Sequence, residues 1–83
     1  MFINKTSDQR NNVCGRFIAL YRKELKISQR ELADRMQLVG IDIDKNAIQR
    51  IEAGQRFVTD IELIAFGKLF DKSLEALLFG EKA

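Results

Sequence analysis

Four polar residues between positions 45 and 50 have the side chains and spacing for hydrogen-bonding chemistry: Lys45, Asn46, Gln49 and Arg50. Asn, Gln and Arg can form paired hydrogen bonds with the edges of bases, and Lys and Arg can also bind phosphates. At about 100° per residue in a helix, these side chains share one face, with Lys45 on its flank. The pattern therefore predicts a helix that presents hydrogen-bonding groups to a DNA major groove.

The opposite face of this helix carries Asp44, Ile48, Ile51 and Glu52. Asp44 can cap the helix, Ile48 stands at a hydrophobic-staple position, and Gly54 provides a stop. An ordinary amphipathic surface helix would show the same two faces. The interpretation therefore depends on the neighbouring elements.

A helix with a clear start signal precedes it. Ser28 and Glu31 have the spacing of a capping box, and Ile27 and Leu32 have that of a hydrophobic staple. Gly40 can adopt the left-handed conformation that ends helices. We predict a helix from Ser28 to Leu38 or Val39 whose inward residues are Leu32, Ala33 and Met36.

Three further helices complete the prediction. The first begins at Asn11 or Asn12 and continues to about Lys26, with a core-facing stripe of Cys14, Phe17, Ile18, Tyr21 and Leu25. The fourth begins with a capping box at Thr59 and Glu62, and its expected inward residues are Ile61, Ile64, Ala65, Phe66 and Leu69. The fifth is short and capped by Ser73, with Leu74, Leu77 and Leu78 apolar. Five helices without a convincing strand predict a compact all-α fold.

The composition fits one small domain. The chain has 83 residues, of which 46% are hydrophobic and 31% charged. We predict a flexible, polar N-terminal arm at residues 1–10 and a folded domain at residues 11–83. Since no apolar run is long enough to span a membrane and the N-terminus lacks a signal-peptide core, we expect a cytoplasmic protein without membrane contact. The single Cys14 cannot form an internal disulfide, which also fits a reducing compartment.

Charge is unevenly distributed along the chain. Residues 1–56 hold 11 Lys and Arg against 7 Asp and Glu, whereas residues 57–83 hold 3 against 5. This asymmetry favours a polyanionic partner for the first two-thirds of the chain.

The sequence does not favour an enzyme. It has no histidine, no Gly-rich phosphate loop and no metal-ligand cluster, and its carboxylates stand at capping and surface positions. Cys14 has no histidine to activate it and is better interpreted as a small buried residue. We therefore expect no catalytic activity, cofactor, metal or small-molecule ligand.

Taken in order, these motifs resemble the lambda-repressor-like, Cro/XRE-type helix-turn-helix family over roughly residues 12–79. The matching residues are Arg22, Ile27-Ser28-Gln29, Leu32-Ala33, Ile48, Ile51-Glu52, Gly54, Thr59-Asp60-Ile61-Glu62-Leu63 and Ser73-Leu74-Glu75-Ala76-Leu77-Leu78. The resemblance implies a five-helix DNA-binding domain in which the second and third helices form the helix-turn-helix.

The resemblance also implies roles for particular residues. Base contacts would come from Lys45, Asn46 and Arg50, with Gln49 as a further candidate, and phosphate contacts from Gln29, Gln55 and Arg56. Arg22 and Glu52 would form an internal ion pair between the first and third helices, the alternative being two independent surface charges.

The segment between Ala33 and Ile48 departs from the family pattern, because it is about five residues longer than the shortest form. An extra helical turn before Gly40 would absorb most of the difference. The extension can shift where the third helix enters the groove. It also places Asp42 close to the expected phosphate surface, where its charge would repel DNA.

The sequence thus predicts a stand-alone, prokaryotic or phage transcriptional regulator that binds double-stranded DNA sequence-specifically, as a homodimeric repressor or controller on a palindromic operator. Phage repressors, restriction-modification controllers and antitoxins all fit a domain of this size. The expected dimer surface comprises Phe70, Leu78 and Phe79, unless these residues simply close the core. The alternative function is a protein-interaction module, such as an antitoxin that masks a partner protein.

Overall fold

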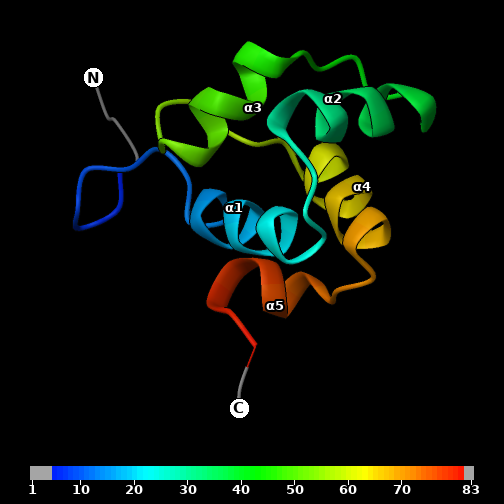
Figure 1. Cartoon of the computed structure of the whole chain (residues 1–83). Helices are drawn as coiled ribbons and strands as arrows, with labels where there is room; N and C mark the ends of the chain where they lie inside the picture. Colours follow the sequence, from blue (N-terminus) through cyan, green and yellow to red (C-terminus); the bar gives the residue numbers. More distant parts are fainter. Residues whose placement is uncertain (1–4, 82–83) are drawn as a thin grey trace.

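Five helices make up the secondary structure of residues 5–81, which are the residues that the computed structural model describes. They are α1 (Gly15–Glu24), α2 (Gln29–Leu38), α3 (Lys45–Glu52), α4 (Asp60–Phe70) and α5 (Leu74–Phe79). In Figure 1, α1 lies at the centre, with α2 and α3 on one side of it, α5 on the other and α4 beside them. The predicted all-α fold is confirmed. Within the described part of the chain, no helix has the length and apolar character to cross a membrane.

The N-terminal caps predicted for α2, α3, α4 and α5 are all present in the structure. Ser28 and Thr59 each accept a hydrogen bond from the backbone N–H three residues later, and Glu31 and Glu62 complete the two capping boxes. Asp44 caps α3 by accepting from the Ala47 N–H at 2.7 Å, and Ser73 caps α5 in the same way. These signals are local in sequence, so the pattern alone was enough to find them.

The first helix is shorter than predicted. It begins at Gly15 rather than at Asn11 or Asn12, although the Asn12 side chain does accept the Gly15 N–H at 2.8 Å. It ends at Glu24 because Lys26 adopts a left-handed conformation, with φ of 58°. Leu25, expected on the core-facing stripe, lies in the resulting turn and is largely exposed.

One hydrophobic core receives side chains from all five helices. Its most deeply buried members are Ile18, Tyr21, Leu32, Met36, Ile48, Ile51, Phe66 and Leu77. The Tyr21 hydroxyl donates to the Ala76 carbonyl at 2.8 Å, which ties α1 to α5. The inward residues predicted for α2 are all buried.

The predicted inward face of α4 is partly wrong. Ile61 and Ile64 are exposed, whereas Phe66 is buried as expected and Ala65 and Leu69 pack against the core. The buried face also carries Glu62, Gly67 and Phe70. This helix is apolar over much of its circumference, so periodicity does not specify which side faces the core. The large aromatic side chains fill the interior, with the Phe66 and Phe70 rings stacked at a centroid distance of 6.2 Å.

The long connection between α2 and α3 consists of a C-terminal extension of α2 and a loop that is stabilised by hydrogen bonds. α2 reaches Leu38, and Gly40 then adopts φ of 87° while the Ile41 N–H donates to the Met36 carbonyl at 3.0 Å. The Gln37 amide crosses the loop to donate to the Ile43 carbonyl at 2.9 Å.

Residues 5–10 form a closed turn. The Thr6 N–H donates to the Arg10 carbonyl at 2.8 Å, and the Asp8 carboxylate pairs with Arg16 of α1. Residues 1–4 of the predicted arm lie outside the described residues. The flexibility of the arm stays a prediction.

Candidate nucleic-acid interface

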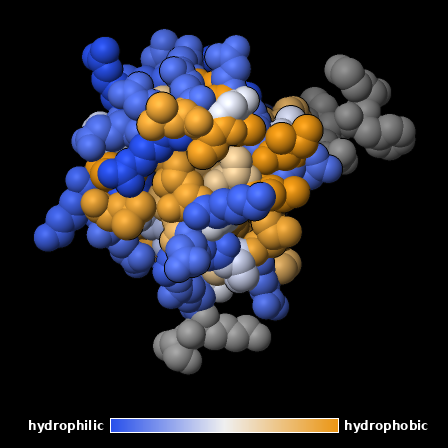
Figure 2. Space-filling model, turned by 90° about the vertical axis from the view of Figure 1, so that its right-hand side faces the viewer, coloured by the Kyte–Doolittle hydropathy of each residue, from blue (hydrophilic) through white to orange (hydrophobic). Residues whose placement is uncertain are grey.

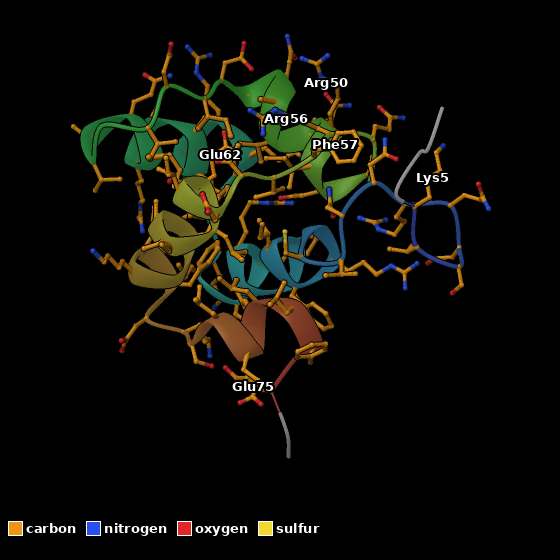
Figure 3. All side chains as sticks on the ribbon, turned by 180° about the vertical axis from the view of Figure 1, so that it is seen from behind. Lys5, Arg50, Arg56, Phe57, Glu62 and Glu75 are labelled. Atoms are coloured by element: carbon orange, nitrogen blue, oxygen red, sulfur yellow. The ribbon has the colours of Figure 1, made fainter. Side chains whose placement is uncertain are left out.

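The outward face of α3 carries the four polar residues that the sequence singled out. Lys45, Asn46, Gln49 and Arg50 are all exposed, while Ala47, Ile48 and Ile51 on the other side are buried. Figure 3 shows Arg50 projecting away from the body of the protein. The helix therefore offers amide, ammonium and guanidinium groups to a ligand while its back is fixed in the core.

The predicted ion pair between Arg22 and Glu52 is present and holds α3 against α1. Arg22 donates from Nε and Nη2 to the two carboxylate oxygens of Glu52, at 2.7 and 3.0 Å. Its Nη1 donates to the Ile27 carbonyl at 2.9 Å, at the start of the turn into α2. The hydrogen bonds from Arg22 to Glu52 raise the pKa of the guanidinium further. Since both side chains are largely buried, removing one partner would cost roughly 3–5 kcal/mol.

Gln29, predicted to bind a phosphate, forms a hydrogen bond inside the protein. Its Nε2 donates to Glu52 Oε1 at 3.0 Å, so the first residue of α2 joins the Arg22–Glu52 pair. One N–H of the Gln29 amide remains for a phosphate, and the first backbone N–H groups of α2 lie beside it.

Arg56, the second predicted phosphate ligand, is engaged elsewhere. Its two terminal nitrogens each donate to Glu62 at 2.9 Å, and Nη1 also donates to the Phe57 carbonyl at 3.1 Å. Figure 3 shows the pair between the segment after α3 and the start of α4. The charge of Arg56 is thus paired with a largely buried carboxylate, and its phosphate contact stays a prediction. Gln55, the third predicted ligand, is exposed.

Three consecutive residues that the sequence did not single out for this role secure the C-terminal end of α3. Arg10 Nη2 donates to the Glu52 carbonyl at 2.8 Å, and Asn12 Nδ2 donates to the Ile51 and Arg56 carbonyls at 3.1 and 2.7 Å. Asn11 donates from its backbone N–H to the Gly54 carbonyl and from its side chain to the Gln55 carbonyl. We name Arg10-Asn11-Asn12 the α3 clamp.

The α3 clamp gives the Glu52 carbonyl a donor and adds a second donor to the Ile51 carbonyl, which also accepts from the Gly54 N–H. It also places a positive charge at the negative end of the helix dipole. Gly54 fits beneath it for two reasons: its φ is 79°, and a Cβ there would lie 2.7 Å from Arg10 Cζ. The sequence signal was limited to two adjacent asparagines, which we interpreted as helix caps. Their partners lie about forty residues away in sequence, beyond the reach of local patterns.

The helix-turn-helix family model matches residues 18–77, a range that includes both α2 and α3. The chain belongs to the helix-turn-helix family. The predicted Cro/XRE-type resemblance is thereby confirmed.

A solved structure shares the fold of this helix-turn-helix protein. It is the crystal structure of the P22 c2 repressor protein in complex with synthetic operator 9T. The repressor chain and this chain share 27% sequence identity. The match has a TM-score of 0.70 and covers 84% of this chain and 98% of that chain. No curated protein matches the chain.

The residues expected to form a dimer surface do not act as one group in this helix-turn-helix protein. Phe70 is 6% exposed and packs in the core, so it closes the interior and is unavailable to a second copy. Leu78 is half-buried against the core, whereas Phe79 is 76% exposed. Of the three residues expected in the dimer surface, only Phe79 and part of Leu78 are therefore accessible to a second copy.

Cys14 is a buried residue of the core. Burial raises the pKa of its thiol to about 11, which keeps the thiol protonated at neutral pH. Among residues 5–81 there is no group of three or more potential metal-ligating side chains.

Proposed function

We propose that this helix-turn-helix protein is a sequence-specific DNA-binding transcriptional regulator. The observation that carries the proposal is the polar outer face of α3, held in place by the Arg22–Glu52 ion pair on one side and the α3 clamp at its end. The fold shared with a repressor protein that was solved in complex with a synthetic operator supports the same conclusion.

In this proposal α3 lies in the major groove. Asn46, Gln49 and Arg50 bind base edges, and Lys45 binds a base or phosphate at the flank. Gln29 and the N-terminal amides of α2 bind one phosphate, and Gln55 binds another. The phosphate contacts provide affinity that falls with salt, and α3 provides discrimination between sequences.

The finer proposal is a homodimer on a palindromic operator. One copy offers a single recognition helix of eight residues, which reads few base pairs. Two copies related by two-fold symmetry read two half-sites about one helical turn apart, which raises both affinity and specificity.

The test is selection from a random duplex pool, followed by binding measurements on the selected sequences at several salt concentrations. We expect a palindrome whose affinity decreases steeply with salt. Asn46→Ala should relax the preference at one base pair by about 5- to 150-fold, the range for a lost paired contact, with little change in the salt slope because Asn46 is uncharged.

Lys23→Ala is the control. Lys23 is exposed on α1 rather than on α3, so its removal should leave the preference unchanged. Failure to enrich any sequence, with only weak electrostatic binding, would contradict the proposal.

A second role, the binding of a partner protein, is supported by one separate observation. Apolar side chains line an open groove between α2 and α4, away from the polar face of α3.

A further inference from the structure

A groove of about 650 Å³ lies between the C-terminal part of α2 and the outer face of α4. Leu38 and Val39 line it from α2 and the turn that follows, and Ile61 and Ile64 line it from α4. Figure 2 shows apolar side chains gathered on this side of the molecule, bordered by hydrophilic ones.

The apolar residues of this groove are unusually exposed. Leu38 is 86% exposed, Ile61 is 67% exposed and Val39 is 62% exposed. Contiguous apolar surface of this kind marks a site of interaction with another molecule. Leu38 and Val39 belong to the segment that is longer than the shortest family pattern, so the extension helps to build the groove.

The charged residues of the groove all have one sign. Arg35 and Lys68 line it, and its described lining includes no carboxylate. Neither residue takes part in the ion pairs found among residues 5–81. A complementary ligand would therefore combine apolar anchors with acidic side chains.

We propose that this groove binds an amphipathic helix of a partner protein, whose apolar stripe is flanked by Asp or Glu. From Ile61 to Lys68, α4 rises about 10 Å, or roughly two turns, which suits anchors at positions i, i+3 or i+4, and i+7. A second copy of this chain, docked groove to groove, would bring Arg35 and Lys68 against residues of the same charge. Self-association at this face is therefore disfavoured.

The proposed partner and DNA occupy different sides of α2. Asp34 and Gln37 border a hollow that α3 lines with Lys45 and Asn46, whereas Arg35 faces the groove with α4. The two ligands can therefore bind together, and the inference does not depend on the proposed DNA-binding function.

The probe is a synthetic helical peptide of about 14 residues, roughly four turns, with leucines at i, i+3, i+4 and i+7 and flanking glutamates. Its binding to the full chain is followed by changes in backbone amide NMR shifts. We expect saturable shifts at the C-terminal end of α2 and along α4. A peptide with lysine in place of glutamate should bind about tenfold more weakly, and Lys68→Glu should reduce or reverse that preference.

A matched pair of variants separates the groove from general hydrophobic binding. Ile64 and Leu20 are 46% and 48% exposed, and only Ile64 lines the groove. Ile64→Ser should weaken binding of the glutamate peptide about tenfold, and Leu20→Ser should not change it. Three results would overturn the proposal: no saturable binding of the glutamate peptide, equal binding of the two peptides, or a dimer in sedimentation that Ile64→Ser dissociates.

Discussion

Among single residues, Glu62 lies in an unusual environment for an acidic side chain. It is buried, and its carboxylate accepts two hydrogen bonds from Arg56 and one from the Thr59 N–H. These donors, Arg56 first, hold the pKa of the Glu62 carboxyl below its ordinary value of 4.5. The ionised form of Glu62 therefore stabilises the fold and joins the segment after α3 to α4.

Glu62→Gln should lower the free energy of unfolding at pH 7 by about 2 kcal/mol, because charge-assisted hydrogen bonds are replaced by weaker ones. In the wild type, the folded state has the lower pKa, so this stabilisation is complete above pH 4.5 and is lost as pH falls through the folded pKa. The difference between variant and wild type should shrink accordingly below pH 4. Urea unfolding at pH 7 and at pH 3 measures it.

Glu75→Gln is the control for this prediction. Glu75 is exposed on α5, where Figure 3 shows it pointing away from the protein, so its substitution should have little effect at either pH. A Glu62→Gln deficit as large at pH 3 as at pH 7 would show that the ionised carboxylate is not what stabilises the fold.

Glu62 also shows how far single residues could be predicted. Its capping box with Thr59 was predictable, because the partners are three residues apart. Its pairing with Arg56 was not, because the resemblance assigned the same Arg, directly after α3, to a phosphate contact. The burial of Glu62 favours its pairing with Arg56, and the sequence alone does not show which carboxylates are buried.

Among the elements, α3 is held in position by the α3 clamp, whose residues precede α1. Asn12 is 9% exposed and contacts both the last turn of α3 and the segment after it. The helix that we propose to contact DNA is therefore positioned by residues of the preceding loop.

Asn12→Ala should lower the free energy of unfolding by about 2 kcal/mol, because it removes the hydrogen bond to the Arg56 carbonyl and one of the two hydrogen bonds to the Ile51 carbonyl, which also accepts from the Gly54 N–H. Amide hydrogen exchange at Ala53, Gly54 and Gln55 should become faster, and more so than exchange in α5, since the effect is local to the end of α3. NMR exchange on the free protein measures both.

Asn46→Ala provides a like-for-like comparison, because Asn46 is an exposed asparagine of α3 itself. It should leave the exchange rates of the helix end unchanged. Uniform acceleration over the whole chain in Asn12→Ala would refute a specific role for the α3 clamp.

The elements were predictable to different degrees for physical reasons. The starts of the capped helices could be predicted because each cap accepts a hydrogen bond from the backbone N–H three residues later. The caps are Ser28, Asp44, Thr59 and Ser73. The start of α1 was misplaced because the nearby asparagines bind distant carbonyls. The inward face of α4 was misjudged because apolar residues occur on nearly all its sides, so that packing rather than periodicity selects it.

At the scale of the whole molecule, the proposed dimer has a geometric requirement. Two copies joined by a fixed interface hold their α3 helices at one separation and in one relative orientation. Half-sites must then lie on the same side of the DNA.

Inserting five base pairs between the half-sites of the selected palindrome should reduce affinity to that of a single half-site, because the insertion is about half a helical turn. Inserting ten base pairs returns the two half-sites to the same side of the DNA but leaves them farther apart. We therefore expect only partial recovery of affinity. Gel-shift titrations against the three spacings would measure this. Equal affinity for all of them would instead describe independent monomers.

The hydrogen bond from the Tyr21 hydroxyl to the Ala76 carbonyl makes Tyr21 an intrinsic fluorescent probe of the contact between α1 and α5. The chain has one tyrosine and no tryptophan, so its ultraviolet emission arises from Tyr21 together with the much dimmer phenylalanines. That ring is buried, and its hydroxyl joins α1 to α5 rather than to α3. We therefore expect its fluorescence to respond to the release of α5 and not to DNA binding at α3. Folding and recognition can thus be followed separately in the unlabelled wild-type chain.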